Sequence, residues 1–273
     1  MITTDMHVHS CFSSDSSEQM ESIIETAIQK GFSYVYFTDH HDQDFPIHPS
    51  APDMDFQLDF ENYIAKIQQL REQYRSMIDV RIGVEQGICP ETASKITELS
   101  RQYPFDFIIG SSHLTSLDNG DPYYPEYYAG KTNIEAYREY FQSEADNVRL
   151  TDGFDIYGPL DYAIRYCPDP SFVYDFEDYR DIFEVLLKEL IERGKGIEIN
   201  TAGIRKIGYP HPHIEALKLY RSLGGEIITV GSDAHQKEDI GFGFDIAQDL
   251  LKETGFHYYT VFQNRKPEFL PLD

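Results

Sequence analysis

Short apolar segments alternate with longer segments of helical periodicity along the whole of this 273-residue chain. The apolar segments are rich in β-branched and aromatic residues, which favour strands. The predicted strands are residues 3–7, 34–38, 79–85, 105–110, 153–157, 196–200, 226–231 and 257–262. Because strands that are separated by helices pair in parallel with right-handed crossovers, this alternation predicts an α/β fold with a parallel sheet.

The segments between the strands carry apolar residues at i, i+3 and i+4, and several end at a glycine. Residues 18–30, for example, place Met20, Ile23 and Ala27 on one face and stop at Gly31. The predicted helices are residues 18–30, 60–74, 91–103, 133–147, 178–193, 213–223 and 245–254. Seven or eight strand–helix units predict a single-domain (β/α) barrel over residues 1–273. A doubly wound open sheet is the alternative, although the glycine-rich turn of its dinucleotide-binding form is missing after the first strand.

In such a barrel the residues that follow each strand meet at one end. His7 and His9 lie two residues apart on an extended backbone, so their side chains point the same way and can bind one metal ion together. Other residues of metal-ligand type near the strand ends are Asp15, Asp39, His40, His41, Glu85, His113, Asp161, Asp233 and His235. Imidazoles and carboxylates without clustered thiolates favour Zn, Mn or Fe, and the set is too large for one ion. We therefore expect two or three divalent metal ions.

These residues resemble the PHP (polymerase and histidinol phosphatase) superfamily, and within it the histidinol-phosphatase branch. The resemblance runs from residues 6–9 to residues 260–268. It implies a distorted (β/α)7 TIM-like barrel with a trinuclear metal centre. The implied ligands of the first ion are His7, His9, Glu85 and Asp233. Glu85 would bridge to a second ion held by His113, and the implied ligands of the third ion are Asp15, His40 and His235, with Asp15 standing where other members have histidine.

One position departs from the family pattern. The family usually reads Gly-His-x-Asp after the fifth strand, and its histidine ligates the second metal ion, whereas this chain reads Gly158-Pro159-Leu160-Asp161. A proline side chain carries no ligand atom. Candidate replacements are Asp161, His41 and Asp39, and the departure leaves open both the second metal position and, to a lesser extent, the usual substrate.

Arg165 and Arg205 follow the fifth and sixth strands, so both are expected at the mouth of the barrel, where a guanidinium can bind phosphate oxygens. The histidinol phosphatases have arginines at similar places. Lys206 is interpreted as a solvated neighbour, and His211 and His213 as structural residues of a loop and a helix start.

Residues 117–132 form a long loop rich in tyrosine and carboxylates, which is typical of a lid or substrate wall but also of an ordinary aromatic loop on the rim.

The net charge of −24, from 23 basic and 47 acidic residues, disfavours nucleic acid and anionic membranes as partners. No apolar run approaches the roughly 20 residues of a membrane span, and no secretory signal is recognisable. Cys11, Cys89 and Cys167 are odd in number and far apart, so we expect no disulfide framework and a cytoplasmic location.

The leading hypothesis is a metal-dependent phosphomonoesterase that converts L-histidinol phosphate to L-histidinol and phosphate in histidine biosynthesis, as the resemblance implies. Metal ions would polarise the phosphoryl group and activate the attacking water. Arg165 and Arg205 would bind the substrate and stabilise charge in the transition state, and Asp233 or His235 could protonate the leaving alkoxide if metal does not occupy it. The alternatives are another small phosphate ester, a nucleotide or phosphotyrosine as substrate, and a metal-binding barrel without activity. The oligomeric state stays open.

Overall fold

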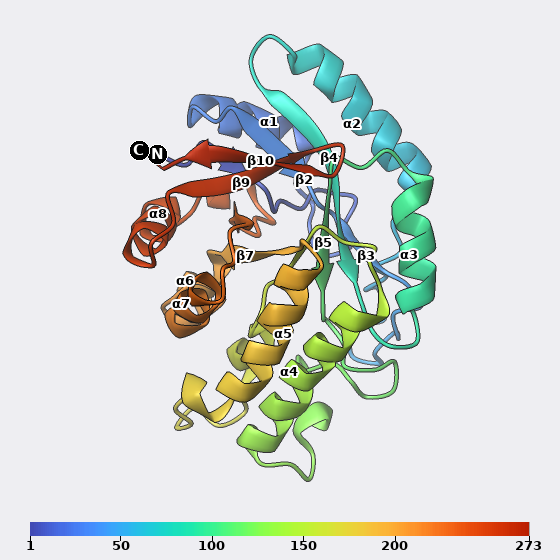
Figure 1. The fold of residues 1–273 in the computed structure, drawn as a ribbon. Helices are drawn as coiled ribbons and strands as arrows, with labels where there is room; N and C mark the ends of the chain where they lie inside the picture. Colours follow the sequence, from blue (N-terminus) through green and yellow to red (C-terminus); the bar gives the residue numbers. More distant parts are fainter. Residues whose placement is uncertain (273) are drawn as a thin grey trace.

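The computed structural model of the protein describes residues 1–272 and has a nearly closed parallel barrel of seven strands, surrounded by helices (Figure 1). The barrel strands are β1 (Thr4–Asp5), β2 (Tyr34–Phe37), β4 (Asp79–Gly87), β5 (Phe107–Ser111), β6 (Ile156–Tyr157), β7 (Gly196–Asn200) and β8 (Ile228–Gly231). They pair in that order. The segments that follow β1 and β8 close the ring through a bridge between Val8 and Ala234. The predicted barrel is confirmed.

Two features of the strands differ from the prediction. A short strand, β3 (His40–Asp42), continues the line of β2 after a break at residues 38–39, and it pairs with β4. The strand predicted at residues 257–262 exists as β9 (Tyr258–Gln263), but it lies outside the barrel and pairs antiparallel with β10 (Lys266–Pro271). The sequence signal for an eighth barrel unit was therefore the first arm of a hairpin.

The seven predicted helices are all present. They are α1 (Met20–Gln29), α2 (Phe60–Tyr74), α3 (Ala93–Gln102), α4 (Asn133–Leu150), α5 (Arg180–Glu192), α7 (Ile214–Ser222) and α8 (Phe244–Glu253). α4 begins with a capping box in which Thr132 and Glu135 satisfy each other's backbone N–H groups. A further short helix, α6 (Ala202–Ile207), occupies residues that were expected to form a loop after β7.

The β9–β10 hairpin covers the amino-terminal end of the barrel, where it lies against β2 and β4 in Figure 1. The Tyr36 hydroxyl in β2 donates to the Phe262 carbonyl (2.6 Å) and accepts from its N–H. Arg265 forms an ion pair at 3.0 Å with Asp155, directly before β6. The carboxyl ends of the strands, where the predicted site residues lie, are thus at the opposite end.

The thiols of Cys11, Cys89 and Cys167 are free. Within residues 1–272, no helix combines the length and the apolar character that crossing a bilayer requires.

Candidate active site

The backbone that follows β1 and β8 places the first histidine pair. His9 N–H donates to the Ala234 carbonyl at 2.8 Å, and both His7 and His9 are fully buried. The Asp5 carboxylate fixes the end of β8 by accepting from the Ser232 N–H and hydroxyl at 3.0 and 2.6 Å. Burial raises the pKa of Asp5 to about 6, and these hydrogen bonds limit the rise. Asp233 comes next, in the left-handed region with φ +53°, and its carboxylate faces the two imidazoles.

Four ligand atoms from three strand ends form a compact group. The Glu85 Oε2 atom lies 3.1 and 3.4 Å from the Nε2 atoms of His7 and His9. The Asp233 Oδ1 atom lies 3.8 and 3.3 Å from the same two nitrogens. A tetrahedral zinc site with ligand distances near 2.1 Å has ligand–ligand edges of about 3.4 Å. Four of the six distances among these atoms are thus close to such an edge, and the ligand atoms of His7, His9 and Glu85 all lie within 4.8 Å of one another.

The hydrogen bonding of these atoms supports the same interpretation. The Nε2 atoms of His7 and His9 and Oε2 of Glu85 are buried, and each lacks a hydrogen-bond partner within the described residues. Such unsatisfied buried atoms are costly unless something else occupies them. Burial raises the pKa of Glu85, but nearby imidazoles outweigh it and hold that pKa well below its ordinary value, so the carboxylate is ionised. This is the form that binds metal.

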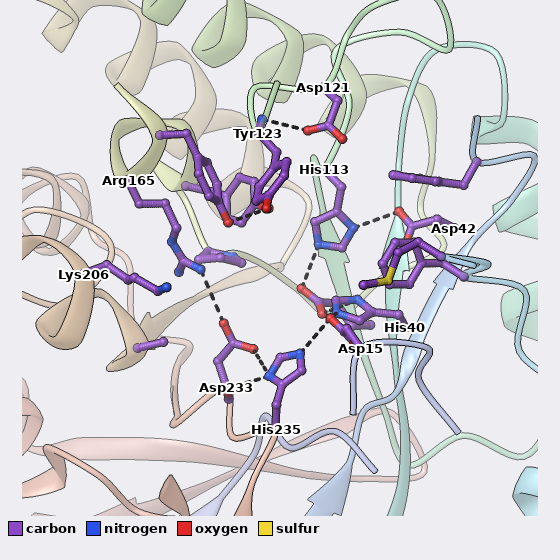
Figure 2. Close-up of a pocket in the computed structure, with 18 of the residues that line it drawn as sticks. Asp15, His40, Asp42, His113, Asp121, Tyr123, Arg165, Lys206, Asp233 and His235 are labelled. Atoms are coloured by element: carbon purple, nitrogen blue, oxygen red, sulfur yellow. Dashed lines mark hydrogen bonds and ion pairs between the residues drawn. The ribbon is translucent and has the colours of Figure 1, made fainter. Parts of the chain in front are cut away.

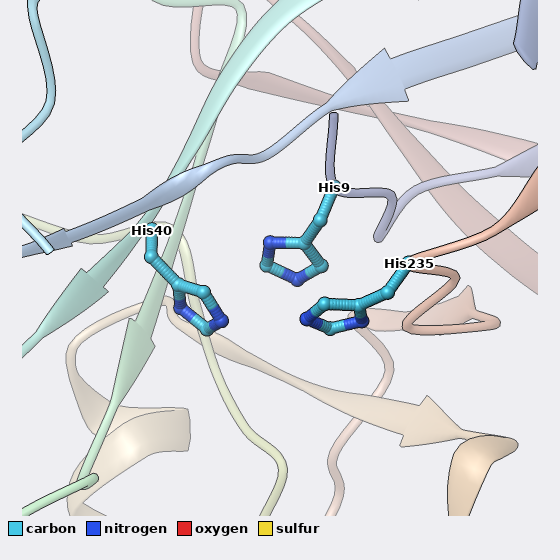
Figure 3. A group of neighbouring side chains, drawn as sticks. All are labelled: His9, His40 and His235. Carbon is cyan, nitrogen blue, oxygen red and sulfur yellow. The ribbon is translucent and has the colours of Figure 1, made fainter. Parts of the chain in front are cut away.

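A second group lies beside the first. Asp15 Oδ2 is 3.4 Å from His40 Nε2 and 3.0 Å from His235 Nε2, so the three implied ligands of one ion meet in the structure. Figure 3 shows the rings of His9, His40 and His235 facing one another from three separate segments, and the His9 ring lies 4.2 Å from each of the other two. The predicted convergence of these residues is therefore present in the geometry.

Fewer ligand atoms converge where the resemblance implies the second ion. Glu85 Oε1 and His113 Nε2 are 3.2 Å apart. The candidate replacements for the family histidine bond elsewhere: Asp39 to Ser10 and Ser13, His41 Nδ1 to the Leu58 N–H, and Asp161 to His211. Pro159 lines the same cavity without a ligand atom.

Two carboxylates that the sequence analysis did not identify bond to the Nδ1 atoms of the ligand-type imidazoles. Glu198 in β7 lies 2.8 Å from His7 Nδ1, and Asp42 in β3 lies 2.8 Å from His113 Nδ1. A carboxylate that accepts from the far nitrogen fixes the tautomer and leaves Nε2 free for metal. Gly231 makes room for this pair, because a Cβ there would lie 2.3 Å from His7 Cβ and 2.4 Å from Glu198 Oε1. The sequence signal that could have identified Glu198 is its position as a charged residue in the middle of the apolar strand β7.

Five residues of the two groups line a cavity of about 370 Å³, namely Asp15, His40, Glu85, Asp233 and His235 (Figure 2). His7 and His9 are fully buried and contact Glu85 and Asp233 without lining it. Much of the remaining lining is aromatic: Phe56 packs on His40, and the other aromatic lining residues are Phe45, Tyr123, Tyr124, Tyr162 and Tyr166. Asp121 also lines the cavity, and burial raises the pKa of its carboxyl to about 6. The front part of the 117–132 loop is thus a cavity wall, whereas Tyr127 and Tyr128 are buried beneath it.

The predicted basic residues also lie at this cavity. Arg165 is buried over the Tyr162 ring, with Nη1 3.8 Å from Asp233 Oδ2, and its Nη2 lacks a hydrogen-bond partner in the described part of the chain. Arg205 lines the cavity while pairing with Asp239 at 3.1 Å. Lys206, interpreted from sequence as a solvated neighbour, also lines the cavity wall. An unpartnered guanidinium nitrogen beside a metal-type site suits a phosphate.

Comparisons with known proteins agree with this site. Residues 5–202 match the PHP domain family. A histidinol-phosphatase of Lactococcus lactis is 32% identical over 263 residues, covering 96% of this chain and 95% of that protein. The crystal structure of the Lactococcus lactis histidinol phosphate phosphatase, complexed with Zn, L-histidinol and phosphate, superposes with a TM-score of 0.88 over 97% of this chain and 98% of that chain.

A second solved structure supports the fold alone. The putative histidinol phosphatase of Listeria monocytogenes is 20% identical, with a TM-score of 0.76 over 89% of this chain and 99% of that chain. The extent of the family match and of the Lactococcus relative leaves no part of the barrel without a counterpart. This chain belongs to the PHP domain family and, within it, to the histidinol-phosphatases.

Proposed function

We propose that this chain is a metal-dependent phosphomonoesterase that hydrolyses L-histidinol phosphate to L-histidinol and phosphate in histidine biosynthesis. The observation that carries the proposal is one cavity lined both by Arg165, whose buried Nη2 has no partner within the described residues, and by Glu85 and Asp233, which contact the unpartnered Nε2 atoms of His7 and His9. The Lactococcus relative, crystallised with both products of that reaction, supports the choice of substrate.

The residues fit two well-ligated divalent ions and a third that is held more openly. His7, His9, Glu85 and Asp233 would hold one ion, and Asp15, His40 and His235 another. Glu85 and His113 would hold the third with help from water or substrate. Zn, Mn and Fe all suit these ligands. When bound, such ions polarise a phosphoryl group and lower the pKa of the attacking water.

The chain's own residues then bind the phosphoryl group and handle protons. Arg165 Nη2 would take one non-bridging oxygen, and Arg205, released from Asp239, a second; both cations stabilise charge that grows in the transition state. His235 and Asp233 lie 3.6 Å apart at the cavity, where either could protonate the leaving alkoxide if it is not fully engaged with metal.

The remaining cavity wall suits the histidinol part of the substrate. Tyr123 lines the cavity with an exposed ring on which an imidazole can pack, and the neighbouring Tyr124 already stacks on the His48 imidazole, with ring centroids 3.6 Å apart. Asp121 supplies a carboxylate whose one side-chain hydrogen bond in the described structure is from the Tyr123 N–H (2.8 Å). We infer that this carboxylate binds the substrate ammonium group. The three free thiols agree with work in the reducing cytoplasm. The net charge of −24 favours a small molecule over nucleic acid or an anionic membrane as the partner.

The test is phosphate release from L-histidinol phosphate by protein reconstituted separately with Zn, Mn and Fe, compared with generic phosphomonoesters. We expect a large preference in kcat/KM for histidinol phosphate and loss of activity after chelation. Arg165→Ala should lower kcat/KM by about 100-fold or more, as removal of a transition-state charge contact does. Activity on other esters but not on this one would overturn the substrate and keep the chemistry.

The second candidate is hydrolysis of another small phosphate ester. Pro159 favours it, because the metal position beside His113 differs from the family pattern. The ester panel of the same experiment decides between the two. A metal-binding barrel without activity is disfavoured by the unpartnered Arg165 nitrogen, which a purely structural metal site does not need.

A further inference from the structure

The back of Arg165, away from the cavity, is held by a buried chain of polar groups. Arg165 Nε donates to His211 Nε2 at 3.2 Å, and His211 Nδ1 bonds to Asp161 Oδ1. His211 and Asp161 are fully buried, and neither of them lines the cavity. His211 was interpreted from sequence as a structural loop residue, so its contact with a cavity arginine is new information from the fold.

The chemistry of arginine decides which group donates and which accepts in each of these hydrogen bonds. A guanidinium can only donate, so His211 Nε2 must accept and must carry no hydrogen. The hydrogen of the neutral ring is therefore on Nδ1, which donates to Asp161. Burial lowers the pKa of His211, in keeping with a neutral ring. The other oxygen of Asp161 accepts from the His213 N–H at 2.8 Å, so both carboxylate oxygens are used.

The hydrogen-bonded groups Arg165, His211 and Asp161 are held in place by the backbone segments around them. The His211 backbone forms a pair of hydrogen bonds with Asn200 at the end of β7 (2.8 and 2.9 Å). Asp161 stands at φ +54°, directly before the short helix η2 (Tyr162–Tyr166) that carries Arg165. The guanidinium is thus held from its Nε side by groups fixed to the barrel, while Nη1 lies 3.8 Å from Asp233 and the buried Nη2 has no partner within the described residues.

We propose that His211 and Asp161 are positioning residues that set the tautomer and the hydrogen bond by which Arg165 is aimed at the phosphoryl group. The proposal rests on the proposed phosphatase function for its reaction but not for the identity of the ester. Asp161 keeps His211 Nδ1 protonated, His211 then accepts from Nε, and the two Nη groups keep the direction that a phosphate needs. A misplacement of about 1 Å in such a group can cost about 100-fold in rate.

Asp161→Asn is the sharpest variant because it conserves shape. The Asn carbonyl must keep the His213 N–H, so its NH₂ group faces His211 Nδ1. That nitrogen must then accept, which moves the ring hydrogen to Nε2 and sets N–H against N–H at Arg165. We expect kcat/KM to fall by about 10- to 100-fold for histidinol phosphate and for p-nitrophenyl phosphate alike, with weaker inhibition by inorganic phosphate.

The decisive measurement is a double-mutant cycle of Asp161→Asn with Arg165→Ala. If Asp161 acts through Arg165, the double variant should be within about twofold of Arg165→Ala alone, because the arginine is already gone. The proposal would be overturned if the fold-losses in kcat/KM of the two single variants multiplied in the double variant. An unchanged kcat/KM in Asp161→Asn would overturn it as well. Metal content and Tm are measured for each variant, since a purely structural role would lower Tm in both backgrounds.

Further variants keep the test open if Asp161→Asn folds poorly. His211→Gln retains an acceptor for Arg165 and should lose less activity than His211→Leu, whereas equal losses would contradict the proposal. His213→Ser is the matched control: its backbone N–H still bonds Asp161, so activity should stay close to that of the wild type. If the wild type hydrolyses only generic esters, the substrate proposal fails and the cycle proceeds on those esters. If it hydrolyses none, calorimetric titration with inorganic phosphate still compares the variants.

Discussion

Glu198 shows how a residue that never meets a substrate can govern a metal centre. Its carboxylate lies against His7 Nδ1 and also accepts from the Asn200 amide at 3.1 Å. Glu198→Gln keeps the shape but removes the charge that supports the imidazole as a ligand. We expect metal affinity to fall by about 10- to 100-fold, measured by competition with a chromogenic chelator.

A matched control exists elsewhere in the chain. Glu144 in α4 is also fully buried, burial raises its pKa well above the ordinary value, and within the described residues it forms no hydrogen bond or ion pair with any of the metal-type ligands. Glu144→Gln should therefore leave metal affinity unchanged. Equal effects of the two substitutions would show that general packing, rather than the His7 contact, is responsible.

Asp121 gives a prediction that depends on pH. Because burial raises its pKa to about 6, the carboxyl is charged above that pH and neutral below it. Its attraction for a substrate ammonium is then present at pH 7.5 and lost as the pH falls through about 6. We expect KM for histidinol phosphate to rise over that range, and Asp121→Asn to have a high KM throughout. An Asp121→Asn enzyme that keeps the pH dependence of the wild type would assign the effect to another group.

Among the secondary-structure elements, the β9–β10 hairpin has a stabilising role that is separable from catalysis. Arg265 Nε pairs with the buried Asp155 carboxylate, which also accepts from the Ile108 N–H at 2.9 Å. Arg265→Ala leaves this carboxylate short of a partner, so we expect a loss of about 1–3 kcal/mol in the free energy of unfolding, with kcat/KM unchanged. Urea denaturation and steady-state kinetics measure the two effects. Arg180→Ala, which removes an exposed pair with Glu177, should change neither.

The long helices and most barrel strands could be predicted from sequence because their periodicity is local. β3 and α6 could not, since β3 spans three residues and exists through its pairing with β4, and α6 has six residues. The hairpin was read as one more barrel strand because a strand pattern does not say which strand it will join.

At the site, the histidines and carboxylates at the strand ends could be identified because parallel strands bring their carboxyl ends together. His211 could not, because its partners Arg165 and Asp161 lie 46 and 50 residues away in sequence and are not marked by any spacing rule. Glu198 is hidden for a related reason: it lies inside the β7 strand, whereas the strand-end rule points only to residues that follow a strand.

Considered as a whole, the molecule couples metal binding to protons. Without metal, burial lowers the pKa of His113, but Asp42 and Glu85 outweigh it and raise that pKa to about 10 from 6.5. The pKa of His7 is likewise raised well above the ordinary value. Both rings then hold a proton at neutral pH that a metal must displace. We expect metal loading to release protons and to weaken as the pH falls, which calorimetry in buffers of different ionisation enthalpy will detect.

The raised pKa of His113 also determines how the stability of the metal-free protein changes with pH. In the metal-free protein the ion pairs of His113 contribute fully below about pH 6.5, and their contribution is lost as the pH rises through about 10. Added Zn should raise Tm because it binds only the folded chain, and the increase should be larger at pH 8 than at pH 6. A Tm that does not respond to metal at either pH would count against the assembled site.

The hairpin that covers the amino-terminal end of the barrel also limits the route by which substrate and products can move. With that end covered by contacts such as those of Tyr36 and Arg265, we expect substrate to enter, and both products to leave, through the cavity at the carboxyl ends of the strands. In the proposed binding mode the phosphoryl group lies against Arg165 and Asp233, and the alcohol lies nearer the opening of the cavity. We therefore expect the alcohol to leave first and phosphate last, so that inorganic phosphate competes with substrate for the free enzyme.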